Sequence, residues 1–186
     1  MGEQARLFVA AVLPQAVRTE LARWARSGVA AGAGSGLRRL EPQTMHLTLC
    51  FLGDQPLACA AGLADVLGGL AEAVAGVGEL VVGAPVWLPP RRPRALAVEI
   101  GDPDGALREL RALLAREIAA TIDWLPERQQ FRPHVTVARG RPGGPRPGAL
   151  AVTPQLRFAC ERVALLRSHL EPAGARYEEL ASVGGW

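Results

Sequence analysis

The chain has 186 residues, which suits one domain, and 49% of them are hydrophobic, which is ample for a core. No apolar stretch approaches the roughly 18 residues of a membrane-spanning helix, so we expect a soluble, cytoplasmic protein. The net charge of +3 permits an anionic partner without demonstrating one. The three cysteines, Cys50, Cys59 and Cys160, lack the paired spacing of a metal site, and we expect them to be reduced.

Predicted strands and helices mix along the chain without strict alternation. Apolar segments with strand-like patterns predict strands at 6–12, 46–49, 80–87, 94–100, 134–137, 156–160, 162–167 and 177–181. Apolar residues at helical spacing predict helices at 14–29, 56–77 and 103–120. Glycine-rich stretches predict connectors at 30–36 and 140–148. This mixture predicts an α+β fold with antiparallel strand pairing.

Two of the predicted strands carry the same short motif, a histidine followed two residues later by a threonine. The first copy comprises His46 and Thr48, and the second comprises His134 and Thr136. Because residues two apart on a strand point to the same face, each copy presents an imidazole beside a hydroxyl, while apolar neighbours anchor the other face. Two imidazoles can act near neutral pH as a general acid and a general base.

The two motifs lie in matching contexts. His46 and His134 are 88 residues apart, and the same distance of 88 residues separates Arg6 from Arg94, each of which opens an apolar strand. A predicted helix follows each of these two strands. We interpret the pattern as an internal duplication.

Arginines near the motifs are candidates for binding an anion. All 21 basic residues of the chain are arginine, and we expect most of them to be solvated at the surface. Arg132 and Arg139 flank the second motif, and the planar guanidinium suits bidentate contacts with phosphate. We therefore expect these two arginines to bind substrate.

The sequence resembles the 2H phosphoesterases, and within them the bacterial and archaeal RNA 2′,3′-cyclic phosphodiesterases, once called 2′-5′ RNA ligases. The resemblance covers nearly the whole chain and rests on residues 6–10, 46–53, 131–139, 166–170 and 174–177. It implies a single bilobal domain over residues 1–186, with two lobes related by a pseudo-twofold axis. Each lobe would hold an antiparallel sheet flanked by helices, and both motifs would lie in a central cleft.

The resemblance also implies a metal-independent hydrolase with no cofactor. His46 and His134 would be catalytic, and Thr48 and Thr136 would hold phosphate oxygens. The substrates would be RNA ends or nucleotides with 2′,3′-cyclic phosphates, opened to 2′-phosphomonoesters, with reversible 2′-5′ RNA joining as a second activity. If the 3′ oxygen leaves, His46 would be the acid and His134 the base. We expect a monomer.

Two further roles implied by the resemblance meet a geometric difficulty. Phe51 would stack on a base, and Arg139 would contact the phosphate. Each lies five residues after the histidine of its motif, so ideal strand alternation turns it away from the cleft. Only a bulge or a strand end would turn these side chains inward; otherwise Phe51 belongs to the core.

Two other classes of function compete with this interpretation. Histidines are common zinc ligands, but hydroxyls are weak ligands, and no carboxylate or cysteine beside the motifs completes a familiar tetrahedral site. A non-catalytic RNA-binding module would use the same cleft, although both motifs are intact. The third histidine, His169, does not match the motif, and we expect a structural role for it.

Overall fold

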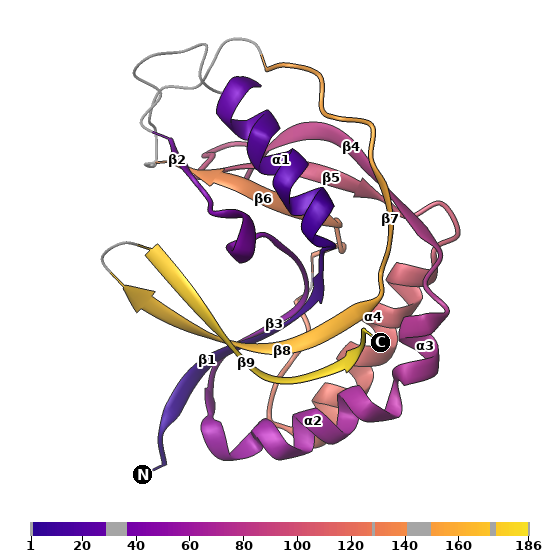
Figure 1. Cartoon of the computed structure of the whole chain (residues 1–186). Helices are drawn as coiled ribbons and strands as arrows, with labels where there is room; N and C mark the ends of the chain where they lie inside the picture. Colours follow the sequence, from indigo (N-terminus) through magenta and orange to yellow (C-terminus); the bar gives the residue numbers. More distant parts are fainter. Residues whose placement is uncertain (1, 29–36, 128, 141–149, 172–173, 186) are drawn as a thin grey trace.

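The computed structural model describes residues 2–28, 37–127, 129–140, 150–171 and 174–185. Within these residues nine strands form one curled sheet, which Figure 1 shows. The strands are β1 (Gln4–Val12), β2 (Arg38–Arg39), β3 (His46–Pro56), β4 (Glu79–Leu88), β5 (Ala95–Gly101), β6 (His134–Arg139), β7 (Arg157–Ala159), β8 (Arg162–Glu171) and β9 (Gly174–Gly184). The predicted connector at 30–36 and nearly all of the one at 140–148 lie outside the described residues.

The sheet consists of two four-stranded halves that meet edge to edge. Its strand order is β7-β4-β5-β6-β3-β1-β8-β9, with antiparallel pairing throughout, and the short β2 also pairs with β6. The halves join where β3 meets β6, through the residue pair Leu47 and Val135. The predicted α+β class and antiparallel pairing are confirmed, and the two expected sheets are the halves of one continuous sheet.

Helices tie the two halves of the sheet together. They are α1 (Gln15–Gly28), α2 (Ala60–Gly69), α3 (Ala71–Ala75) and α4 (Ala106–Thr121), with 3₁₀ helices at Pro42–Thr44 and Leu57–Cys59. Helix α1 follows β1 but contacts β2 and β6 of the other half, while α4 follows β5 but contacts β3. In Figure 1, α1 accordingly lies beside the half with β4, β5 and β6, and α2, α3 and α4 gather on the side of β8 and β9. This reciprocal crossing agrees with the predicted duplication.

The helix predicted at 56–77 is broken in the structure. Strand β3 continues to Pro56, a 3₁₀ helix follows, and α2 and α3 are separated at Leu70, whose φ and ψ are −107° and 16°. The break comes directly after Gly68 and Gly69. Adjacent glycines weaken a helix because glycine loses more backbone entropy on folding than any other residue. The predicted helix at 56–77 was therefore wrong in its continuity.

The core between the sheet and the helices anchors the two motif strands. Leu47, Val135 and Val137 are fully buried, and Leu49 is nearly so. The histidine and threonine of each motif lie on the opposite strand face and are only partly buried. The predicted alternation is therefore confirmed. In the described ranges, no helix has both the length and the apolar character needed to cross a bilayer.

Candidate active site

The two His-x-Thr motifs meet where the halves of the sheet join. Their central residues, Leu47 and Val135, pair across antiparallel strands. Each histidine therefore lies across from the threonine of the other motif. The structure thus brings together two motifs that are 88 residues apart in the sequence.

A β-bulge in β3 brings Phe51 onto the same face as His46. Val9 and Ala10, which are adjacent in β1, pair with positions 50 and 48 of β3, so Leu49 is an extra residue. Both Leu49 and the residue after it are consequently buried, and the alternation shifts by one position. Phe51 then faces the same way as His46 and is 36% exposed.

The second motif strand has a bulge at the equivalent position. Leu96 and Ala97 of β5 pair with positions 138 and 136 of β6, so Val137 is the extra residue. Arg139, at the end of β6, thereby returns to the face of His134 and is exposed. The bulges resolve the geometric difficulty that the sequence raised for both Phe51 and Arg139.

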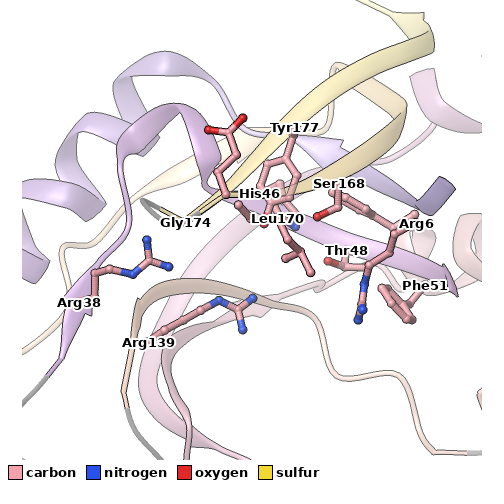
Figure 2. A pocket seen from close by; sticks show the side chains of 13 residues that line it. Arg6, Arg38, His46, Thr48, Phe51, Arg139, Ser168, Leu170, Gly174 and Tyr177 are labelled. Carbon is pink, nitrogen blue, oxygen red and sulfur yellow. The ribbon is translucent and has the colours of Figure 1, made fainter. Parts of the chain in front are cut away.

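A cavity of about 530 Å³ opens beside His46 and is drawn in Figure 2. Strands β1, β2, β3 and β6 contribute side chains to it, and the end of the β8–β9 hairpin supplies the remainder. Figure 2 shows Arg38 and Arg139, from paired positions of β2 and β6, extending into the same space. The charged lining residues are Arg6, Arg38, Arg139 and Glu171. The cavity is therefore predominantly basic and suits an anionic ligand.

His46 is packed among aromatic side chains and anchored to the backbone. Its Nδ1 lies 2.8 Å from the carbonyl oxygen of Thr44, and because a carbonyl only accepts, Nδ1 is the donor and Nε2 is left for proton exchange. Its ring centroid lies 4.9 Å from that of Phe8 and 5.0 Å from that of Tyr177. Burial lowers the pKa of His46 to about 4; the hydrogen bond to Thr44 opposes this effect, and the charge of Arg139 adds to it.

His134 is anchored by the same backbone contact. Its Nδ1 donates to the carbonyl oxygen of Arg132, again two residues earlier, at 2.7 Å. The Nε2 atom of this ring is likewise left for proton exchange. In the part of the chain that the structure describes, no aromatic ring packs on His134, so the two imidazoles have different surroundings.

A second cavity, of about 480 Å³, lies on the side of His134 and is called here the His134 cavity. Thr48 and Phe51 border both cavities. His46 borders the first cavity, and His134 borders the second, together with Arg111 of α4. The shared residues therefore form the boundary between two spaces, each with its own histidine.

Two of the predicted site residues, Arg132 and Thr136, are less favourably placed to contact a ligand. Arg132 lines the His134 cavity, but its guanidinium forms an ion pair with Glu99, with Nε 2.9 Å from Oε1. Glu99 comes within reach because it pairs with His134 across β5 and β6. Thr136 lies on the motif face but is not among the residues that line either cavity.

Arg6 and Tyr177 both line the first cavity, although neither was predicted as a site residue. The guanidinium carbon of Arg6 lies 4.9 Å from the centre of the Phe51 ring. A sequence signal for Arg6 existed, because it opens the segment 6–10 that carries part of the family resemblance. Tyr177, which ends the segment 174–177 of the same resemblance, reaches His46 from β9.

The third histidine and the cysteines lie outside this arrangement. Nε2 of His169 lies 2.7 Å from Oε2 of Glu178 on the neighbouring strand, which agrees with a structural role. The three cysteines are free thiols. Among the described residues, no three His, Cys, Asp or Glu side chains are grouped in a way that could hold a metal ion.

Comparisons of the sequence with known proteins point to one family. The sequence model of the 2′-5′ RNA ligase superfamily matches residues 13–172. A protein of Thermus thermophilus, named RNA 2′,3′-cyclic phosphodiesterase, is 30% identical over 184 residues, and the match covers 94% of this chain and 87% of the relative. A protein of Aeropyrum pernix with the same name is 32% identical over 109 residues, which cover 59% of this chain and 60% of the relative.

Solved structures show the same fold. The crystal structure of TT0787 from Thermus thermophilus has a TM-score of 0.75 and 27% identity, and the match covers 96% of this chain and 97% of that one. The crystal structure of Escherichia coli LigT complexed with 3′-AMP has a TM-score of 0.77 and 21% identity, with 98% of each chain covered. Because the family model spans most of the sequence, the chain belongs to the 2′-5′ RNA ligase superfamily.

Proposed function

We propose that this protein is an RNA 2′,3′-cyclic phosphodiesterase that hydrolyses cyclic phosphates of RNA ends or nucleotides to 2′-phosphomonoesters, and that it can join RNA reversibly through 2′-5′ linkages. The observation that carries the proposal is the pair of motif histidines. Each is anchored through Nδ1 to the backbone, and each leaves Nε2 available on adjoining strands. The names of the relatives from Thermus thermophilus and Aeropyrum pernix support it.

The reaction needs two proton transfers on opposite sides of phosphorus. Water must lose a proton as it attacks, and the departing ribose oxygen must gain one. His46 and His134 are the proposed pair, and each transfer contributes roughly 10²–10⁴-fold to the rate. Because the two imidazoles lie on either side of the boundary formed by Thr48 and Phe51, they suit attack and departure along one line.

The phosphate is the anion that the basic cavity would hold. We assign its non-bridging oxygens to the hydroxyls of Thr48 and Thr136 and to the guanidinium of Arg139. Arg6, which lines the same cavity as Arg139, is an additional cation. Within the described ranges, neither guanidinium forms an ion pair or hydrogen bond with another residue, so both can bind an anion without breaking one. Thr136 would have to act from the edge of the site.

The base of the nucleotide is assigned to Phe51. Its ring borders the cavity and is partly exposed, and the Arg6 guanidinium lies over it. A base stacked there would gain both an aromatic surface and a nearby cation. Arg132 would contribute to substrate binding only if it left its partner Glu99, so its role is the weakest of the proposed set.

We retain His46 as the acid and His134 as the base, with the 3′ oxygen leaving. This direction places a condition on His46, because a pKa of about 4 keeps its ring neutral at pH 7 before substrate binds. The anionic phosphate must therefore raise that pKa on binding, as a nearby opposite charge does. If it does not, the roles of the two histidines are exchanged and the 2′ oxygen leaves.

The test is incubation of the purified protein with nucleoside 2′,3′-cyclic phosphates and with RNAs that end in a cyclic phosphate. We expect turnover, with ³¹P NMR showing a 2′-phosphomonoester. A predominant 3′-phosphomonoester would overturn the direction of ring opening. Tight RNA binding without turnover would instead identify a non-catalytic RNA-binding module.

We further propose that residues 1–186 act as one bilobal domain, in a cytoplasmic monomer that uses neither metal nor cofactor. Support for one domain comes from the core, in which buried residues of β1, β3, β5 and β6 form one cluster. The free cysteines suit a reducing compartment. Sedimentation of the purified protein would measure its oligomeric state.

A further inference from the structure

The His134 cavity contains a cation for which the proposed hydrolysis has no use. This cation is Arg111 of α4, a helix that contacts β3. Its guanidinium carbon lies 5.5 Å from the centre of the Phe131 ring, which lines the same cavity. Its Nε atom is buried and has no hydrogen-bond partner.

Arg111 differs from Arg132, the other arginine that lines the His134 cavity. Glu99 neutralises Arg132 at this end of the sheet, whereas the Arg111 side chain forms no ion pair or hydrogen bond with the residues that the structure describes. Glu127 lines the same cavity but is not paired with it. A polar group withdrawn from water without a partner is unfavourable, and a charged one more so. A bound anion in the cavity would neutralise this guanidinium.

The position of the cavity indicates which anion it would hold. In-line chemistry at phosphorus exchanges one oxygen on each side, and in the proposed direction the departing 3′ oxygen and its ribose lie toward His46. The attacking oxygen then enters from the side of His134. In hydrolysis this oxygen belongs to water, and in 2′-5′ joining it is the 5′-hydroxyl of a second RNA end. The nucleoside that carries this hydroxyl must lie beside His134.

We propose that the His134 cavity is the subsite for the nucleoside that is joined through its 5′ oxygen in a 2′-5′ linkage, and that Arg111 binds the 3′-phosphate of that nucleoside. The Phe131 ring offers an apolar surface for its base, and the amides of Gln129 and Gln130 offer polar contacts. The inference rests on the proposed function, because it takes the position of phosphorus from the two motif histidines.

The cleavage of a 2′-5′ linkage at this site balances without a further reactant. The 3′-hydroxyl of the first nucleoside attacks phosphorus and gives its proton to the histidine beside it. The bond from phosphorus to the 5′ oxygen breaks, and that oxygen takes a proton from His134. The products are a 2′,3′-cyclic phosphate and a 5′-hydroxyl nucleoside, and joining is the same path reversed.

The test compares two 2′-5′-linked dinucleotides that differ only in a 3′-phosphate on the second nucleoside. For the wild-type protein we expect kcat/KM for cleavage to be on the order of tenfold higher with this phosphate, because a charge-assisted hydrogen bond is involved. In R111Q the advantage should disappear. In R111K, which keeps the charge but loses the planar fork, part of it should remain. R116Q is the matched control, since Arg116 is exposed on the same helix, and it should keep the full advantage.

Hydrolysis of a cyclic mononucleotide by the wild-type protein separates the two proposals. If this hydrolysis is absent, the proposed function fails. If it is present but the dinucleotides are not cleaved, or if R111Q and R111K keep the full advantage of the 3′-phosphate, the subsite is overturned while the proposed function stands.

Discussion

The surroundings of His46 lead to a prediction about its titration. Burial holds the pKa of this imidazole at about 4, against an ordinary value of 6.5. Because each unit of difference in pKa corresponds to 1.36 kcal/mol, protonating His46 in the folded protein costs about 3 kcal/mol more than in the unfolded chain. As the pH falls, the unfolded state therefore binds this proton before the folded state does. The contribution of a neutral, buried His46 to the free energy of unfolding is fully present above pH 6.5 and is lost as the pH falls toward 4.

The Tyr177→Ala substitution tests this cause. Tyr177 is one of two aromatic rings packed on His46, at 5.0 Å between centroids, and its removal admits water to one side of the imidazole. We expect the pKa of His46 to rise by roughly one pH unit, toward the value of a solvated histidine. The measurement is an NMR titration of the imidazole signals, which reports the pKa independently of any change in stability.

Ser168→Ala is the matched control, since Ser168 lines the same cavity from the neighbouring strand β8. It should leave the titration of His46 unchanged. The reasoning would be refuted if His46 titrated near 6.5 in the wild-type protein, or if Tyr177→Ala left its pKa at about 4.

Three further predictions concern catalysis. Thr48→Ala and Thr136→Ala should each lower kcat on the order of 10²-fold, because each removes a donor to the phosphate oxygens. Steady-state kinetics would measure both losses. The smaller loss is expected for Thr136, which lines neither cavity. Arg139→Gln should raise KM or lower kcat for the cyclic nucleotide, whereas Arg26→Gln, at an exposed position in the last turn of α1, should do neither. Activity should survive exhaustive dialysis against a chelator, and recovery only on addition of zinc would instead favour a metal enzyme.

The motif strands were predictable because their signal is local. Strand alternation alone places Leu47 and Val135 in the core and the motif side chains on the other face, as the structure shows. The duplication was visible in the spacing of the two motifs, and the structure extends it to the bulges at Leu49 and Val137. A bulge is set by pairing with the neighbouring strand, so the sequence indicated only that one was needed.

The parts of the site that the sequence did not indicate depend on contacts across the sheet. Tyr177 reaches His46 because β9 and β8 form a hairpin beside β1. Arg132 is paired with Glu99 because β5 lies next to β6, a register that composition and spacing do not reveal. Arg111 lines the His134 cavity from α4, a helix far from the motifs in the sequence, and for that reason it was not among the predicted residues.

The most direct test of the central claim is a double-mutant cycle on the two histidines, measured as kcat/KM for a 2′,3′-cyclic mononucleotide. Circular dichroism should show that His46→Ala and His134→Ala remain folded. Because the two imidazoles act in one transition state, we predict that each single substitution lowers kcat/KM by roughly 10²–10⁴-fold or more. The double variant should be little worse than either single one. Near-normal activity in either single variant, or losses that simply multiply in the double variant, would contradict the account.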